Sequence, residues 1–302
     1  MVARKQPAKQ CGANTADMQK PRGARSESCL DFHRLAEFVE MERDSNPIHP
    51  SASNESGNHT DLIGTRTICW HTRQMPHPPK PDDLRSLLPA PIEVVLSSQA
   101  PSGESSLPDI EMAALDAMKS KRRREFIHGR TCARAALSLL DLPDQAIAVG
   151  TQREPVWPDS IVGSITHCGS VAAAAVARQQ DLGALGIDLE SGHPLDQALL
   201  PMICRPEEIE RLQESSQPLV HAKLIFSAKE SIYKCIWPTL RHFVDFQDIS
   251  IRIDTVAGTF APVHWTDNLP NAVIQPIAGR YLLRDGWIMT TAWIPHPINV
   301  GS

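Results

Sequence analysis

The stretch FSAKESIYKCIWP, residues 226–238, places an acid and a base one helical turn apart. On a helix, Glu230 and Lys234 share one face. Such pairs are usually salt bridges on a solvated surface. The alternative is a site in which the carboxylate helps to complete a Mg²⁺ shell and the ammonium holds a phosphate as a point charge. The apolar stripe expected beside this pair comprises Ala228, Ile232, Cys235 and Ile236.

The stretch GIDLE, residues 186–190, brings two further carboxylates together. In a strand, Asp188 and Glu190 share a face, roughly 6–7 Å apart, and the apolar residues between them point to the core. Close carboxylates repel each other unless a cation lies between them, and Mg²⁺ suits oxygen ligands and phosphate. A solvated face of an antiparallel strand is the alternative. On either interpretation, removal of Asp188 relieves repulsion and is expected to leave the fold intact.

Two more stretches carry groups that bind anions. In GSITHCG, residues 163–169, His167 lies between an expected strand and a glycine-containing turn. There its imidazole meets either an anion or a structural hydrogen-bond partner. Five of the six residues 119–124 are basic, which predicts a solvated helix face, a nucleic-acid patch or a surface for an acidic partner. Arg130 falls at helical spacing from Phe126 and is expected to reach inward to a phosphate.

The elements that must position these groups begin near Leu84. Strands and helices interleave irregularly, which favours an α+β (mixed α/β) fold over a regular parallel sheet. Strands are predicted at 91–98, 146–150, on both sides of a turn at 168–170, and at 182–190, 248–254, 279–286 and 287–294. Helices are predicted at 108–142 with a break near Gly129, at 205–215, and at 218–237, ended by Pro238.

Composition limits the class of protein. Residues 1–83 are rich in Pro, Ser, Asn and His and are expected to be a disordered extension or sequence upstream of the true start. The net charge of −5 disfavours general nucleic-acid binding. Seven cysteines without a C-x-x-C pair indicate reduced thiols rather than zinc or a redox dithiol. No apolar run reaches the roughly 18 residues of a membrane helix, and no secretory signal is evident, so a cytoplasmic protein is expected.

Taken in order, EFxxGRxxA, GSxTH, GIDxE and FSxKESxxK resemble the large, monomeric 4'-phosphopantetheinyl transferases. The resemblance covers about residues 85–295, with roughly 35 residues between the last two motifs. It looks closest to the type attached to enterobactin synthesis and is more distantly similar to the surfactin type. The resemblance implies a monomer of two similar α/β halves, here about 84–180 and 181–300, with coenzyme A between them.

The resemblance also implies an activity. The serine of an apo acyl, peptidyl or aryl carrier protein attacks the β-phosphorus of coenzyme A, and adenosine 3',5'-bisphosphate leaves. Such a reaction depends on positioning and on neutralising phosphate charge. The carriers of this family belong to siderophore, nonribosomal peptide, polyketide or fatty acid synthesis. The basic run at 119–124 is expected to steer an acidic carrier rather than to bind coenzyme A.

Each site residue receives a role from the same resemblance. Glu230 would accept the serine proton, directly or through water, and Lys234 would contact the pyrophosphate. Mg²⁺ would be held with the pyrophosphate by Asp188, Glu190 and Glu230. The coenzyme A phosphates would be contacted by Thr166, His167 and Arg130. The surfactin type carries a cofactor-binding lysine where this chain has Glu154. Arg153 is the expected substitute for that lysine.

Two other functions compete with this one. A catalytically silent coenzyme A-binding regulator of the same fold is disfavoured by the three acids, because a pure binder needs no general base. A nucleic-acid binder using residues 119–124 is disfavoured by the acidic net charge and by the lack of interleaved aromatic residues.

Overall fold

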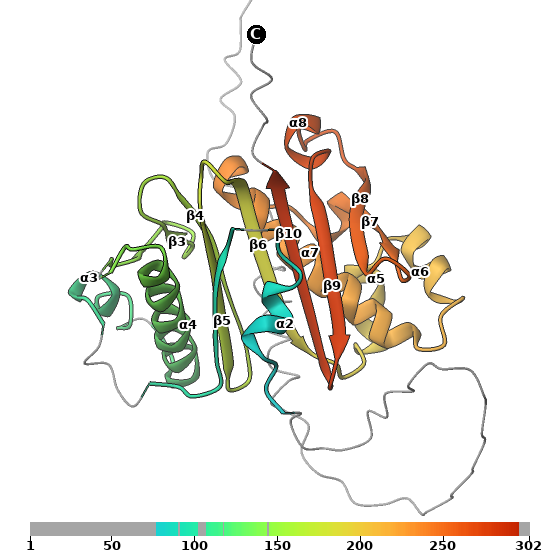
Figure 1. Cartoon of the computed structure of the whole chain (residues 1–302). Coiled ribbons are helices and arrows are strands. Elements are labelled where there is room, and N and C mark those ends of the chain that lie inside the picture. The colour runs from blue at the N-terminus through green and yellow to red at the C-terminus, as the bar shows by residue number, and fades with distance from the viewer. Residues whose placement is uncertain (1–76, 90, 102–106, 117, 144, 296–302) are drawn as a thin grey trace, which may run out of the picture. The chain divides into compact units, whose positions relative to one another are not determined.

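The computed structural model describes residues 77–295 except 90, 102–106, 117 and 144 (Figure 1). Most of the predicted extension, residues 1–76, lies outside the described residues. The expected boundary at Leu84 falls inside helix α2 (Pro81–Arg85), where Leu84 is buried. Pro81 begins this helix at a position where its missing N–H costs nothing. The carbonyl of His77 accepts a 2.7 Å hydrogen bond from the Trp287 indole, so the packed chain starts before Leu84.

The first half is built on a three-stranded antiparallel sheet in the order β1-β5-β4. Its strands are β1 (Glu93–Ser97), β4 (Ile161–Cys168) and β5 (Val171–Arg178). Alternate alanines of β5 belong to two different core clusters, so this strand is buried on both faces. Helix α4 (Ser120–Leu139) packs on the sheet (Figure 1).

The predicted helix 108–142 is two helices, α3 (Asp109–Met112) and α4. The break expected near Gly129 is wrong, because α4 runs through that residue without interruption. A Cβ on Gly129 would lie 2.8 Å from the Ile165 side chain. Glycine is therefore present because α4 approaches strand β4 closely.

The second half is a five-stranded antiparallel sheet in the order β6-β10-β9-β8-β7. Helix α7 (Pro218–Leu240) packs on β6 and β10 (Figure 1). The mixed α/β class is thus confirmed, but β8 was not predicted. The strands are β6 (Leu182–Ser191), β7 (Ile249–Asp254), β8 (Thr259–Trp265), β9 (Ala278–Arg284) and β10 (Trp287–Pro295). The shorter elements are β2 (Ala148–Val149), β3 (Pro155–Val156), η1 (Gln197–Leu199), α5 (Leu200–Ile203), α6 (Pro206–Leu212), η2 (Phe246–Asp248) and α8 (Asn271–Ile274).

Side-chain hydroxyls join the two sheets where β4 runs beside β6. The Ile187 N–H donates to the Ser164 hydroxyl at 3.0 Å, and the Leu189 N–H donates to the Thr166 hydroxyl at 3.2 Å. Both hydroxyls come from the GSITH stretch and take the place of the carbonyls that a neighbouring strand would offer. They satisfy buried backbone donors at the junction and fix the register between the sheet that carries His167 and the strand that carries the GIDLE acids.

Helix α7 lies directly against β6 because the first residue of GIDLE is a glycine. A Cβ on Gly186 would lie 1.9 Å from the Ser231 carbonyl oxygen and 2.7 Å from the Cys235 nitrogen, both backbone atoms of α7. The expectation that Pro238 ends this helix is wrong, since α7 continues to Leu240. Its end comes at Arg241, which has a left-handed φ of 53° and donates its N–H to the Trp237 carbonyl.

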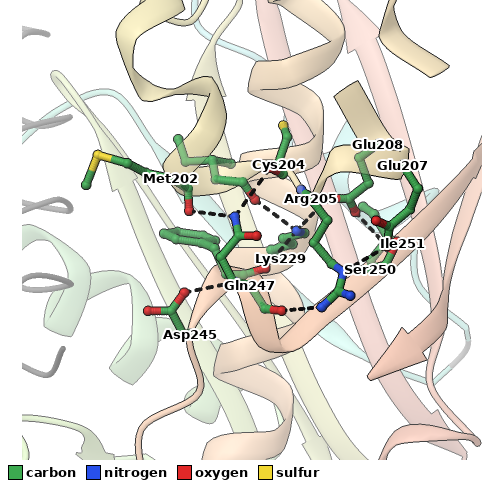
Figure 2. A network of polar contacts seen from close by, with 12 residues as sticks. Met202, Cys204, Arg205, Glu207, Glu208, Lys229, Asp245, Gln247, Ser250 and Ile251 are labelled. Carbon is green, nitrogen blue, oxygen red and sulfur yellow. Dashed lines mark hydrogen bonds and ion pairs between the residues drawn. The ribbon is translucent and has the colours of Figure 1, made fainter. Parts of the chain in front are cut away.

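A buried polar network fixes the other side of α7 (Figure 2). The Lys229 ammonium donates to the carbonyls of Ile203 and Phe246 at 2.9 and 2.8 Å, and to Glu208 at 2.7 Å. Glu208 in turn accepts the Ile251 N–H at 2.8 Å. Lys229, together with its partner Glu208, therefore connects α7 to α5, α6, η2 and β7.

Among the described helices, none is both long enough and apolar enough to cross a membrane.

Candidate active site

Two of the site residues predicted from the sequence, Asp188 on β6 and Lys234 on α7, contact each other where α7 packs on β6. The Lys234 ammonium donates to Asp188 Oδ1 at 2.7 Å and to the Ile187 carbonyl at 3.2 Å. Asp188 is only 4% exposed. Its other oxygen accepts a 2.7 Å hydrogen bond from Ser227, and Thr166 donates to Oδ1 at 3.2 Å. Asp188 is thus the centre of a buried hydrogen-bonded group rather than a solvated surface charge.

The second GIDLE acid has its own lysine. Glu190 is 1% exposed, and Lys223 Nζ lies 3.1 Å from its Oε2. Lys223 also lies over the Phe226 ring, 5.1 Å from its centroid. Because Lys223, Ser227, Glu230 and Lys234 follow one another at spacings of three or four residues, they form one face of α7. This face meets the two buried acids of β6.

These contacts decide between two interpretations of GIDLE. The solvated strand face is excluded, because both carboxylates are buried. The repulsion between them is relieved in this structure by two lysines, so repulsion alone does not require a metal ion. Across the described part of the chain, no group of three His, Cys, Asp or Glu side chains is close enough to hold a metal ion. The carboxylate oxygens are nevertheless the ligands that Mg²⁺ prefers, so the donor chemistry fits this ion.

His167 is the next-to-last residue of strand β4 and contacts the basic run at 119–124. Its Nε2 lies 2.8 Å from Arg122 Nη1 and 3.8 Å from Glu125 Oε2. The His167 ring thus lies between the Arg122 guanidinium and the Glu125 carboxylate. Glu125 also lies 3.6 Å from Arg122 and 3.7 Å from Lys121. Arg122 therefore lies beside His167, and its side chain is still 48% exposed.

Arg130 is buried on α4, as its spacing predicted, and is 3% exposed. Its Nη2 donates to the Ala148 carbonyl at 3.4 Å, and the guanidinium lies 4.9 Å from the centroid of the Phe126 ring. Among residues that the structure describes, Nη1 has no hydrogen-bond partner. Burial lowers the pKa of Arg130 to about 10, while the nearby Glu111 carboxylate opposes that shift. A buried cation with an unused donor is suited to an anion.

The remaining predicted contact, Arg153, lies exposed in the turn between β2 and β3. It has a left-handed φ of 69°. The next residue is Glu154, where the surfactin type carries a lysine. Its carboxylate forms a 2.8 Å ion pair with Arg241 and accepts a 2.9 Å hydrogen bond from the Gln152 N–H. The turn is thereby tied to the end of α7.

Comparison with known proteins identifies the family. The 4'-phosphopantetheinyl transferase N-terminal domain matches residues 111–177, and the 4'-phosphopantetheinyl transferase superfamily matches residues 184–283. The chain is 42% identical to the 4'-phosphopantetheinyl transferase Svp of Streptomyces mobaraensis, over 60% of this chain and 76% of that protein. It is 34% identical to the 4'-phosphopantetheinyl transferase Npt of Nocardia iowensis, over 68% of this chain and 97% of that protein. The chain is 39% identical to enterobactin synthase component D of Escherichia coli K12, over 48% of this chain and 72% of that protein.

The chain belongs to the 4'-phosphopantetheinyl transferases. These enzymes transfer the 4'-phosphopantetheine group from coenzyme A to carrier proteins. The resemblance drawn from the four motifs is therefore confirmed, and the matched relatives give no support to a silent coenzyme A binder.

Several groups at the site of this transferase were missed from sequence. Lys223 and Ser227 lie seven and three residues before Glu230, so helical spacing was a signal that was available but not used. Thr290 is also part of the group, since its hydroxyl lies 3.0 Å from that of Ser227. It comes from β10, opposite Asp188 in the strand pairing, and no local pattern marks it. Glu125 entered the sequence analysis only as the first residue of the EFxxGRxxA motif, and no role was assigned to it.

Proposed function

We propose that this transferase uses the junction of α7 and β6 to move phosphopantetheine onto the serine of an apo carrier protein with the help of Mg²⁺. The observation that carries the proposal is the α7 face of Lys223, Ser227, Glu230 and Lys234 against the buried acids of β6. In the reaction, the serine Oγ forms a bond to the β-phosphorus of coenzyme A. The bond from that phosphorus to the oxygen that bridges it to the α-phosphorus breaks, and adenosine 3',5'-bisphosphate leaves.

Glu230 is proposed as the group that accepts the serine proton. It lies on the same helix face as Lys234 and is half-buried, whereas Asp188 and Glu190 are buried. A serine hydroxyl is mostly protonated at neutral pH and needs such a base. Of the three acids, Glu230 is therefore the one that an incoming hydroxyl reaches most easily.

Asp188, Glu190 and Glu230 would hold Mg²⁺ beside the pyrophosphate. When bound, the ion would neutralise charge on the phosphate oxygens. Lys234 would hold the pyrophosphate as a point charge. Thr166 donates to Asp188 in this structure, so we assign its hydroxyl to orienting that acid rather than to a direct contact with coenzyme A.

Cationic groups of the first half would hold the other end of coenzyme A. Arg130 offers a buried guanidinium with an unused donor among described residues. His167 and Arg122 lie together at the end of β4, and we add Arg122 to the set proposed to bind coenzyme A. Arg153 lies on an exposed turn, and no contact among the residues that the structure describes supports a role for it in binding coenzyme A. Arg241, which pairs with Glu154, provides a second cation near this turn.

We also propose which proteins accept the group, where the enzyme acts and in what oligomeric state. We expect the acceptors to be acyl, peptidyl or aryl carrier proteins of siderophore, nonribosomal peptide, polyketide or fatty acid synthesis. The enzyme is expected to act as a cytoplasmic monomer. Coenzyme A lies between the two halves in this proposal, since the candidate residues come from β4 and α4 on one side and from β6 and α7 on the other.

The test is incubation with coenzyme A, Mg²⁺ and a panel of apo carriers, followed by intact-protein mass measurement. We expect one class of carrier to gain the mass of phosphopantetheine, and we expect the gain to be lost with Glu230→Gln or after chelation of divalent ions. Glu210→Gln, an exposed change on α6, is the matched control. Binding of coenzyme A without a mass gain on any carrier would overturn the proposal in favour of a silent binder.

A further inference from the structure

Glu111 is a completely buried carboxylate that the proposed reaction does not use. It lies on the short helix α3 and is 0% exposed. A buried charge is costly unless it is paired and hydrogen-bonded. Its presence in the core of the first half therefore calls for a function that an apolar residue could not serve.

The two oxygens of Glu111 fix two separate elements. Oε2 pairs with the Arg134 guanidinium of α4. Oε1 accepts a 2.8 Å hydrogen bond from the Ile147 N–H. Glu111 thus links α4 to the backbone at the start of β2.

Both of these partners lie beside Arg130. Ile147 directly precedes Ala148, whose carbonyl accepts the 3.4 Å hydrogen bond from Arg130 Nη2. Arg134 follows Arg130 by four residues and so shares its helix face. Glu111 therefore holds the acceptor that orients one nitrogen of Arg130, while Nη1 keeps no partner among the described residues.

The charges point the same way. Arg134 on its own would repel the Arg130 guanidinium, and Glu111 compensates that repulsion. Because Glu111 is engaged by Arg134 and Ile147, it leaves Nη1 of Arg130 available. The local sum of two guanidiniums and one carboxylate is one positive charge, which suits a bound anion.

We propose that Glu111 is a positioning residue that holds Arg130 in the orientation that binds an anionic group of coenzyme A. This inference rests on the proposed function, in which Arg130 contacts the cofactor. It assigns to α3 an effect on affinity for coenzyme A that is exerted through Arg130. It assigns no effect on the chemical step or on the carrier.

The test compares Glu111→Gln with the matched control Glu210→Gln, in the parent chain and in an Arg130→Ala background. Glutamine keeps the shape and an acceptor for Ile147 but loses the charged pair with Arg134. We expect Glu111→Gln to raise the KM for coenzyme A about fivefold, as for the loss of one hydrogen bond, with kcat and the KM for carrier unchanged. In the Arg130→Ala background the same change should have no further effect.

Two further measurements keep the test decisive. Calorimetric binding of adenosine 3',5'-bisphosphate should weaken by the same factor as the KM rises. If Glu111→Gln does not fold, Arg134→Gln breaks the same ion pair from its partly exposed partner. That change frees Glu111 to pair with Arg130 and should raise the KM for coenzyme A as well.

The outcomes separate the two proposals. A normal KM for coenzyme A in Arg130→Ala would overturn both the role of Arg130 and that of Glu111. A raised KM in Arg130→Ala with an unchanged or lowered KM in Glu111→Gln would overturn the positioning role alone. An effect of Glu111→Gln that persists in the Arg130→Ala background would also overturn it, since Glu111 would then act by another route.

Discussion

Removing the Asp188 carboxylate should destabilise the fold as well as stop the reaction. The sequence alone suggested the opposite, because a carboxylate repelled by Glu190 on an open face would be removed at no cost. In the structure Asp188 is 4% exposed and accepts hydrogen bonds from Lys234, Ser227 and Thr166. Asp188→Ala leaves all three donors to find other partners.

The size of the effect follows from burial and partners. Breaking a buried ion pair costs about 3–5 kcal/mol when the remaining charge has no access to water. The Lys234 side chain is 27% exposed and can be rehydrated, and Ser227 keeps Thr290 at 3.0 Å as a second partner. We therefore expect Asp188→Ala to lower the free energy of unfolding by about 3 kcal/mol. For a domain of this size that corresponds to a fall in Tm of about 6–12 °C.

The assay is thermal and urea unfolding of the parent chain and three variants. Asp188→Asn keeps the shape and one acceptor, so it should lose about half as much stability as Asp188→Ala. Asp159→Ala removes an exposed carboxylate and should change the Tm little. A Tm for Asp188→Ala equal to or above that of the parent would refute the reasoning, because Asp188 would then be a repelled surface charge.

Three other predictions follow from single contacts. Gly186→Ala should cost at least about 3 kcal/mol of stability, measured by urea unfolding, because its Cβ meets the backbone of α7 and not a movable side chain; a normal unfolding midpoint would show that α7 can shift at little cost. Arg122→Glu should raise the KM for coenzyme A, whereas Lys119→Glu should alter only the KM for carrier, most at low salt; equal effects of the two on carrier would return Arg122 to the outer surface. Burial raises the pKa of Cys132 to about 11 and that of Cys204 to about 12, so peptide mapping after alkylation at pH 8 should find both thiols unmodified in the native protein and modified in urea.

Sequence periodicity found the elements of the fold whose pattern is local. The hairpin of β4 and β5, the strand β6 and the helix α7 were all expected close to where they lie. The errors came from treating glycine and proline as breaks. Gly129 serves close packing within a continuous helix, and Pro238 is accommodated inside the last turn of α7. Strand β8 was missed because most of its side chains are exposed or half-exposed, which leaves no strong apolar alternation.

The candidate site was predictable as a set of acids and bases, but the pairing between them was not. Helical and strand spacing placed Glu230 beside Lys234 and Asp188 beside Glu190. Which lysine neutralises which acid depends on how α7 crosses β6, and no local pattern contains that information. A metal ion was inferred from repulsion between two carboxylates, and two lysines relieve that repulsion in the structure. Mg²⁺ therefore rests on the donor chemistry and on the family rather than on charge balance.

Lys229, Glu230 and Lys234 are close in sequence, but the geometry of helix α7 directs them to different neighbours. Successive residues on a helix are turned by about 100°, so Lys229 and Glu230 cannot face the same neighbour. Lys229 points to α5, α6 and η2, where three hydrogen bonds fix α7 from behind (Figure 2). Lys234, four residues beyond Glu230, reaches Asp188 across the close contact that Gly186 permits. Glu230 shares with Lys223, Ser227 and Lys234 the face of α7 that meets the acids of β6, and this is the face on which a proton acceptor is needed.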